Sequence, residues 1–374
     1  MAVTKRLRCF ALFLLALVTA SCAADETIAP YQPRFGRSRP VIAVVGENAG
    51  TVLSDYAIPY GLLARSALAD VVSVATERGL LTLTPLRIAP DTTMVQFDTR
   101  YPEGADYVFV PAVKVPDDPA LLDWIRAQAG KGATMISICN GSLVLAHAGL
   151  TRGRRATGHW STYQSRLTKF PDTMWRKNVR YVVDGPVVSS AGITAAIPVS
   201  LALVEAIGGT ARANSLAASI GAAGWSTQHD SDAFRLTASD YFHGAVNTLL
   251  HGTDDIGLPI SDGADEIALA LTAEAYSDTL RSRIHVLAPT AAPVRTRGGL
   301  MLVPDLVAGR DRTPDVMLPV MDNTMGGLPD ALVPNRLLAD IAARYGAATA
   351  RLIVLDWEYP AANYLDAPPT TSND

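Results

Sequence analysis

The sequence predicts an α/β protein with a doubly wound, mostly parallel sheet and a smaller C-terminal α/β part. Short Val- and Ile-rich runs alternate with helical runs from residue 40 onward. These strand-like runs are almost continuously apolar, which is typical of parallel strands covered on both faces. Helix and strand patterns resume after a turn-rich segment at residues 254–265, and this segment marks the expected boundary between the two parts.

The expected elements follow in chain order. Strand-like runs occupy residues 40–46, 71–76, 83–89, 107–113 and 134–139, and helical stretches occupy residues 60–69, 119–130 and 195–207. Between them, "RYVVDGPVVSSAG" predicts a hairpin that turns at Asp184 and Gly185. Residues 210–250 are expected to be helical and to close the first domain. We therefore place the domains at residues 40–250 and 255–365.

The second part resembles the first in the order of its patterns. Residues 265–289 and 298–305 follow the order of residues 55–75 and 86–91, and residues 335–356 parallel residues 119–139. This predicts a degenerate half repeat, with the counterpart of the nucleophile near Asp356 and a strand ending in "DWEYP". Chance similarity explains the pattern nearly as well, because strand-helix-strand units resemble one another. Glu274 is expected on a solvated face of this repeat.

The N-terminus predicts export. Lys5, Arg6 and Arg8 precede an apolar run, Cys9–Val18, whose length suits a signal peptide and is too short to span a bilayer. The following "VTASC" resembles the lipobox of bacterial lipoproteins, with Thr19 in place of the usual leucine. We therefore expect lipidation at Cys22, anchoring to the membrane in the periplasm, a tether at residues 23–39 and a disordered polar tail at residues 366–374.

Charge and cysteine content exclude several classes of protein. A net charge of −4, a pI near 5.9 and no block of Lys and Arg after residue 25 argue against a nucleic-acid partner. With three cysteines in the chain and cleavage at Cys22, Cys139 has no intrachain thiol in the folded part to pair with. The histidines lack paired ligand spacing, so we expect neither a metal site nor a cofactor. They include His147, His229, His243, His251 and His285.

Cys139 stands where a strand-like run turns into a helical run. Ser137 and Gly141, two residues before and after it, are small enough for the sharp turn of a nucleophile elbow. At the carboxyl end of a parallel strand, a thiol faces helix N-termini that favour its thiolate form. The sequence therefore predicts a nucleophile at Cys139, although a lone cysteine among apolar residues is more often a packing residue.

Two further motifs accompany the elbow, namely "RATGHW" with His159 and "LSDYAIPYGLL" with Asp55. Together with Cys139 they resemble the DJ-1/PfpI (ThiJ/PfpI) superfamily, the class I glutamine amidotransferase-like fold, over about residues 40–210. The resemblance is closest to isonitrile hydratases and to the N-terminal, GlxA-like domain of AraC-type regulators. It implies a flavodoxin-like three-layer sandwich.

The resemblance also implies roles for particular residues. Cys139 would be the nucleophile, Asp55 the acid that contacts the thiol, and His159 an assisting histidine. Residues expected to face the substrate or a developing oxyanion are Asn140, Gly141, Gly50, Gly192 and Thr194. Asn140 replaces the threonine common after the cysteine, and Gly158 replaces the threonine before the histidine, so the substrate of a relative cannot be carried over.

Purely structural interpretations of these residues also stay open. Asp55 would serve as the cap of a helix beginning near Pro59, and His159 as a structural residue. The leading hypothesis is an exported cysteine enzyme acting on a small electrophile, of hydratase, glyoxalase-like or amidase type, without a cofactor. The alternative is a ligand- or redox-sensing protein related to the regulators. The resemblance further implies a homodimer, or a pseudo-dimer within one chain if the half repeat is real.

Overall fold

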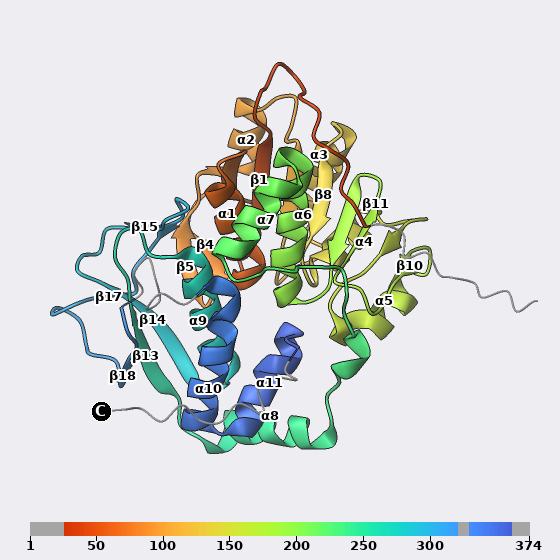
Figure 1. Ribbon diagram of the computed structural model, residues 1–374. Helices are drawn as coiled ribbons and strands as arrows, with labels where there is room; N and C mark the ends of the chain where they lie inside the picture. The colour runs from red at the N-terminus through yellow and green to blue at the C-terminus, as the bar shows by residue number, and fades with distance from the viewer. Residues whose placement is uncertain (1–25, 321–328, 361–374) are drawn as a thin grey trace, which may run out of the picture.

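A computed structural model describes residues 26–320 and 329–360 of the chain. At its centre lies a seven-stranded sheet in the order β11-β12-β8-β7-β1-β3-β6 (Figure 1). Neighbouring strands are parallel except in the hairpin β11–β12. This confirms the predicted doubly wound α/β class. Its strands are β1 (Val41–Gly46), β3 (Asp70–Ala75), β6 (Thr92–Thr93), β7 (Tyr107–Val110), β8 (Thr134–Ser137), β11 (Tyr181–Asp184) and β12 (Val187–Ser190).

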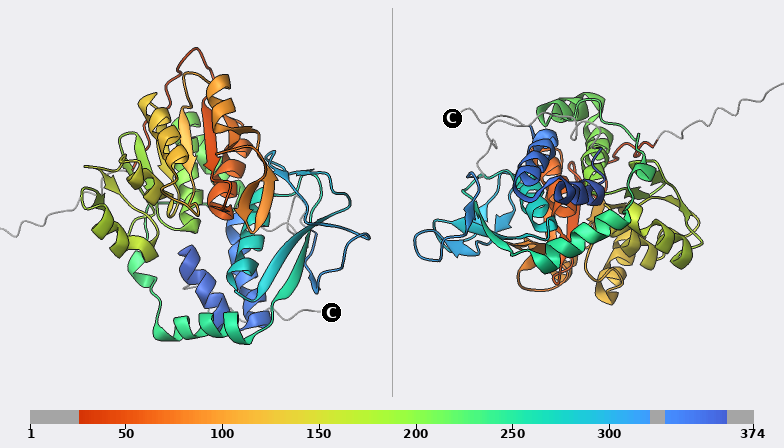
Figure 2. Two further views of the ribbon diagram at one scale, coloured as in Figure 1. Left: turned by 180° about the vertical axis from the view of Figure 1, so that it is seen from behind. Right: turned by 90° about the horizontal axis from the view of Figure 1, so that it is seen from below.

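Helices cover both faces of this sheet. On one face, α1 and α6 pack together and share a hydrophobic core with α7, and on the other face α2, α3 and α4 enclose a second core (Figure 2). The helices of this part are α1 (Leu53–Ser66), α2 (Met94–Arg100), α3 (Pro119–Gly130), α4 (Gly141–His147), α5 (Tyr163–Lys169), α6 (Ala196–Gly208) and α7 (Thr210–Ser219). Every residue of β1 is buried, which explains why residues 41–46 are continuously apolar and show no alternation of apolar and polar residues.

Local signals in the sequence explain where several elements begin and turn. The α3 helix starts with Asp118, whose side chain accepts a hydrogen bond from the Leu121 N–H, and with Pro119 in its first turn. The hairpin forms where it is predicted, with Gly185 at φ 61° in the turn between β11 and β12. A capping box between Thr93 and Gln96 starts α2.

The first helix begins earlier than the sequence suggests. We expected a helix near Tyr60, after Pro59, but α1 starts at Leu53 and keeps Pro59 inside. Asp55 therefore lies in the first turn and does not cap the helix, and Val52 in the capping position makes no side-chain bond. The capping interpretation of Asp55 is wrong.

The second part forms its own parallel pair and joins the first. The β13 strand (Asp254–Pro259), α9 (Glu266–Asp278) and β14 (Ser282–Ala288) form a β-α-β unit in which the two strands are parallel. The remaining elements of the second part are β15 (Val294–Arg295), β16 (Met301–Leu302), β17 (Leu306–Val307), β18 (Val316–Met317), α10 (Val333–Tyr345) and α11 (Ala347–Trp357). Strand β16 continues a sheet of the first part, in the order β15-β16-β5-β4-β2. Its other strands are β2 (Thr51–Val52), β4 (Leu81–Thr84) and β5 (Leu86–Ala89).

Two short elements and one long helix complete the described part. A two-stranded parallel sheet joins β9 (Arg155–Ala156) to β10 (Met174–Trp175). The predicted helical region at residues 210–250 holds α7 and, after a break, α8 (Ala238–Leu250). Helix α8 packs against α11 of the second part, at the lower side of the molecule in Figure 1.

Helices α1 and α9 pack antiparallel to each other. The Ser54 N–H at the start of α1 donates to Glu274 near the end of α9. At the opposite ends, Arg65 of α1 bonds to Asp265 and Glu266 at the start of α9. The second part is thereby attached along the length of the helix that carries Asp55.

The proposed parallel between residues 335–356 and residues 119–139 fails in its last third. Where the parallel requires a strand ending at Asp356, the chain forms helix α11 up to Trp357. Alanine, leucine and β-branched residues satisfy a buried strand and a buried helix equally well, and the length of this run favours the helix.

The N-terminal segment from residue 26 to residue 39 lies along the first part. Glu26 pairs with Arg155, the Tyr31 N–H bonds to the Ala206 carbonyl, and Arg34 donates to the Gly132 carbonyl. These described residues are therefore bound to the domain surface. The predicted signal peptide, Cys22 and the tail at residues 366–374 lie outside the described residues.

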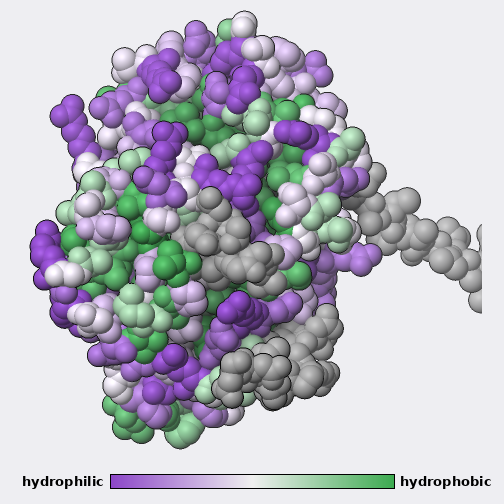
Figure 3. All heavy atoms as spheres, turned by 60° about the vertical axis from the view of Figure 1, so that its left-hand side comes forward, coloured by the Kyte–Doolittle hydropathy of each residue, from purple (hydrophilic) through white to green (hydrophobic). Residues whose placement is uncertain are grey.

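Within the described ranges, no helix is both long and apolar enough to cross a membrane. Figure 3 views the molecule from the side of the second part and shows polar residues spread among apolar ones over this face.

We predict that Arg65→Met destabilises the whole chain. The Arg65 side chain is 8 % exposed and contacts Asp265, Glu266 and Asp330. Its loss leaves Glu266 and Asp330 without a cation and Asp265 with only Arg297, at 3.7 Å, which costs about 3–5 kcal/mol in unfolding free energy. Urea unfolding followed by circular dichroism measures this loss.

Arg152→Met is the control, because Arg152 is exposed and pairs with the exposed Asp172. A change within about 0.5 kcal/mol is expected there. Equal stability of both variants would show that Arg65 does not join the two parts.

Candidate functional site

Cys139 occupies a strained turn between β8 and α4. Its φ angle is 56°, in the left-handed region that non-glycine residues rarely adopt. The Cys139 N–H donates to the Ala191 carbonyl, and the Ser142 hydroxyl donates to the Cys139 carbonyl. These bonds hold the strained turn in place, as expected for a nucleophile elbow.

The residue two positions after Cys139 must be glycine. A Cβ atom on Gly141 would lie 1.9 Å from the Val110 carbonyl oxygen, a backbone atom of the neighbouring strand β7. The small residue predicted for the elbow is therefore required by the close approach of two backbones.

Asp55 lies beneath the thiol and is fully buried. Its Oδ2 accepts a hydrogen bond from the Ala112 N–H at 3.0 Å. Its Oδ1 has no partner of ordinary hydrogen-bond geometry, and the Cys139 thiol is the neighbouring polar group that acts on this carboxyl. Burial raises the pKa of Asp55 to about 7, so near neutral pH this carboxyl both accepts and releases a proton.

The Cys139 thiol is protonated at rest. Burial raises its pKa well above the ordinary value, and the nearby carboxyls of Asp55, Asp356 and Glu358 raise it further. The expectation that a helix N-terminus favours the thiolate is wrong here, because α4 spans 7 residues and the negative groups outweigh its dipole. The thiol therefore needs a base.

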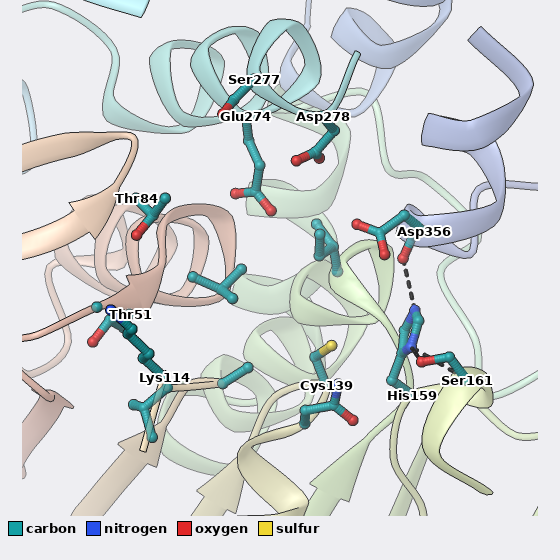
Figure 4. A pocket seen from close by; sticks show the side chains of 16 residues that line it. Thr51, Thr84, Lys114, Cys139, His159, Ser161, Glu274, Ser277, Asp278 and Asp356 are labelled. Atoms are coloured by element: carbon teal, nitrogen blue, oxygen red, sulfur yellow. Dashed lines mark hydrogen bonds between the residues drawn. The ribbon is translucent and has the colours of Figure 1, made fainter. Parts of the chain in front are cut away.

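His159 lies in the wall of the same cavity, but its ring is engaged elsewhere. Its Nδ1 bonds to the Ser161 hydroxyl and its Nε2 to the Asp356 carbonyl oxygen, each at 2.7 Å (Figure 4). Because a carbonyl only accepts, Nε2 carries the proton and Nδ1 accepts from Ser161. The structure thus gives His159 a positioning role that connects the first part to the end of α11.

Among the predicted substrate-facing backbone groups, Asn140 keeps its place. It lines the cavity, its N–H acts on the Cys139 sulfur, and its side chain accepts from the Thr162 hydroxyl. Two expectations are wrong: the Gly50 N–H donates to the Glu47 carbonyl and the Gly141 N–H to the Ile138 carbonyl. Both N–H groups are used inside the protein, although Gly50 itself lines the cavity.

Gly192 and Thr194 hold the C-terminal segment and do not line the cavity around Cys139. A Cβ on Gly192 would lie 2.9 Å from the Glu358 side chain, and the Thr194 hydroxyl donates to the Glu358 carbonyl. Glu358 in turn accepts from the Trp160 N–H and pairs with His229. Ile193, which stands between them, does line the cavity, and a contact of Gly192 or Thr194 with a substrate stays a prediction.

The cavity above the thiol has a volume of about 360 Å³ and is lined from both parts of the chain (Figure 4). The first part contributes Cys139, Asn140 and His159, among others. The second part contributes residues that the sequence interpretation assigned no place in the site. These are Glu274, Ser277 and Asp278 of α9 and Asp356 of α11.

The expectation for Glu274 is wrong. It is 5 % exposed, its Oε2 accepts from the Ser54 N–H at 2.6 Å, and burial raises its pKa well above the ordinary value. One signal was available: "EIALALTAEAYSD" is apolar on nearly all sides, so an acid within it is buried with the helix.

Among residues 26–320 and 329–360, no three His, Cys, Asp or Glu side chains are arranged to hold a metal ion.

A cysteine in a strained strand-to-helix turn, at the carboxyl edge of a doubly wound sheet and beside a buried acid, places this chain among doubly wound α/β proteins with a site at the sheet edge. Residues 42–206 match the model of the DJ-1/PfpI family, so the chain carries a DJ-1/PfpI family domain. The matched residues contain Cys139, Asp55 and His159. Glu274, Asp278 and Asp356 lie outside them.

Two characterised relatives match parts of this chain. It is 33 % identical over 158 residues to an isonitrile hydratase of Pseudomonas putida, covering 40 % of this chain and 65 % of the relative. It is 41 % identical over 86 residues to the HTH-type transcriptional regulator CdhR of Pseudomonas aeruginosa, covering 23 % of this chain and 25 % of the regulator. The chain thus spans less than two thirds of either relative.

Among solved structures, Drosophila melanogaster DJ-1beta matches with a TM-score of 0.43 and 21 % identity, covering 48 % of this chain and 96 % of that one. This level of similarity supports no statement about activity.

Proposed function

We propose that this protein is a cysteine enzyme that acts on a small electrophile, of hydratase, glyoxalase-like or amidase type. The observation that carries the proposal is the strained Cys139 thiol, which lines the cavity and is paired with the fully buried Asp55 carboxyl. A cavity of about 360 Å³ suits a small molecule.

The pair has the properties of a nucleophile and its base. As the sulfur attacks an electrophilic carbon, the Asp55 carboxylate accepts the thiol proton, and it then returns the proton to the substrate. With an isonitrile, the product of this step is a thioimidate bound to Cys139. Water then adds to its carbon and expels the thiol, which gives an N-substituted formamide. The Asn140 N–H lies beside the sulfur, where negative charge develops.

A second candidate is ligand sensing without turnover. The observation that favours it is the resting thiol, which burial and three carboxyls hold in its protonated, unreactive form. The partial match to a transcriptional regulator agrees with this candidate.

We predict that Cys139→Ala abolishes turnover while the fold is kept, since a buried cysteine and alanine differ little in volume. Wild type and variant are incubated with a panel of small aldehydes, amides and isonitriles, and product formation is followed by mass spectrometry. Turnover by wild type alone supports the enzyme. Equal turnover by the variant would remove Cys139 as nucleophile.

The variant Cys139→Ser, tested with the same panel of compounds, distinguishes ligand sensing from catalysis. Ligand binding that persists in this variant, seen as a thermal shift with no product from either protein, would replace the enzyme proposal.

We predict that kcat/KM rises with pH and levels off above about 7, because only the ionised Asp55 takes the thiol proton and its pKa is about 7. Below that pKa the rate falls about tenfold per pH unit. Asp55→Asn should lose about 10²–10⁴-fold in rate and should lack this rise. Asp123→Asn, an exposed change on α3, serves as the control. A pH profile in Asp55→Asn like that of wild type would exclude Asp55 as the base.

We also propose that the protein is exported to the periplasm and lipidated at Cys22. The basic residues, the apolar run and the "VTASC" motif support this proposal. In cells fed labelled palmitate, wild type should incorporate label and Cys22→Ala should not. Label-free protein outside the cytoplasm would indicate ordinary secretion instead.

A further inference from the structure

The cavity wall opposite Cys139 is lined with carboxyls from the second part. Glu274 and Asp278 project from α9 and Asp356 from the end of α11, all toward the space above the thiol (Figure 4). The lining residues of this cavity include two basic side chains, Lys114 and His159. Lys114 is exposed and lies on the far side from Asp278 and Asp356, and both ring nitrogens of His159 are already bonded, to the Ser161 hydroxyl and the Asp356 carbonyl.

These carboxyls have no cationic partner among the described residues. Glu274 accepts from the Ser54 N–H, and Asp278 accepts from the Trp357 indole N–H at 3.0 Å. Neither they nor Asp356 form a salt bridge with any side chain in the described ranges. Elsewhere in the same protein buried acids are paired, as Asp265 and Glu266 are with Arg65.

One acid of the cavity wall keeps an oxygen free for a ligand. Glu274 is 5 % exposed, and its Oε2 accepts from the Ser54 N–H, whereas no hydrogen bond to its Oε1 is formed by the described residues. In Figure 4 the Glu274 carboxyl points into the cavity. An unpartnered acceptor on a buried acid, aimed at a cavity, points to a ligand that donates a hydrogen bond there.

The energetics favour a charged ligand over a neutral one. Burial raises the pKa values of Glu274 and Asp278, and repulsion from Asp278 and from Asp356, respectively, adds to this. Burial therefore favours the neutral form of Glu274 and Asp278, because no cation lies beside them to stabilise the charged form. A positive group bound among them supplies the missing charge and keeps the carboxylates ionised.

Resting on the cysteine chemistry proposed above, we propose that the substrate is a small electrophile that carries an ammonium or guanidinium group. Glu274, Asp278 and Asp356 hold the positive group while the electrophilic carbon lies against Cys139. Because these acids lie outside residues 42–206, the preference belongs to the second part and not to the DJ-1/PfpI family domain.

Three thiol reagents of one type and different charge test this inference. They are trimethylammonioethyl, sulfonatoethyl and methyl methanethiosulfonate, which are cationic, anionic and neutral. Each forms a disulfide between Cys139 and the reagent's thioalkyl sulfur while the reagent's S–S bond breaks. Methanesulfinate leaves with the bonding electron pair and the thiol proton goes to the buffer. Peptide mass spectrometry of the full-length protein follows the Cys139 peptide, so reaction at Cys9 and Cys22 does not interfere.

The quantity to compare is the ratio of the cationic to the anionic rate constant at Cys139, divided by the same ratio for N-acetylcysteine. We expect a normalised ratio of about tenfold or more, since a cleft lined by one sign of charge raises rates about 10–10³-fold. Glu274→Gln and Asp278→Asn should each lower it several-fold. Both changes keep a hydrogen-bond acceptor of the same shape. Glu103→Gln is the matched control, because Glu103 is exposed and makes no side-chain contact in the described structure.

The neutral reagent separates the possible failures. A variant that keeps the wild-type rate with it is folded and has an accessible thiol. If Cys139 reacts with the neutral reagent but the normalised ratio is near one, or is unchanged in both acid variants, the cation preference is refuted and the cysteine enzyme still stands. If Cys139 reacts with none of the three, both proposals fall.

Discussion

The antiparallel packing of α1 against α9 is the contact on which the site depends. Helix α1 carries Asp55 in its first turn, lies against the central sheet and α6, and receives α9 along its exposed side. The same contact brings Glu274 over the cavity and fixes it through the Ser54 N–H. The base of the thiol and the opposite wall of the cavity are therefore positioned by one helix pair, whose far end is closed by Arg65.

The unpaired acids around Cys139 lower the stability of the chain and, at the same time, set the protonation of the groups beside the thiol. Packing them with arginines, as Arg65 does elsewhere, would stabilise the chain but would also hold the Asp55 carboxyl ionised at low pH and fill the space above the thiol. Left unpaired, the carboxyls raise one another's pKa values, and Asp55 titrates near neutrality. Burial, with a smaller contribution from Asp356, thus places the pKa of Asp55 near neutrality, and the unpaired acids underlie the cation preference proposed above.

The sequence was sufficient for the sheet and the elbow because their signals are local. The all-buried run at residues 41–46 and the close approach at Gly141 leave few other structures for those residues. The wall formed by the second part was not predictable in the same way. Its acids lie more than 130 residues from Cys139 along the chain, and the buried position of Glu274 depends on which helix α9 packs against. The predicted oxyanion roles of the Gly50 and Gly141 N–H groups failed for a related reason. Loop geometry determines that these groups bond to the Glu47 and Ile138 carbonyls, and the residue types alone do not reveal this.

The Asp356 carbonyl that holds His159 belongs to the last turn of the final described helix. During synthesis, Asp55, Cys139, His159 and the acids of α9 are all made before this residue. A chain that ended before α11 would lack Asp356 in the cavity wall and the bond that holds His159. The surroundings of Cys139 are therefore complete only once this late helix has docked.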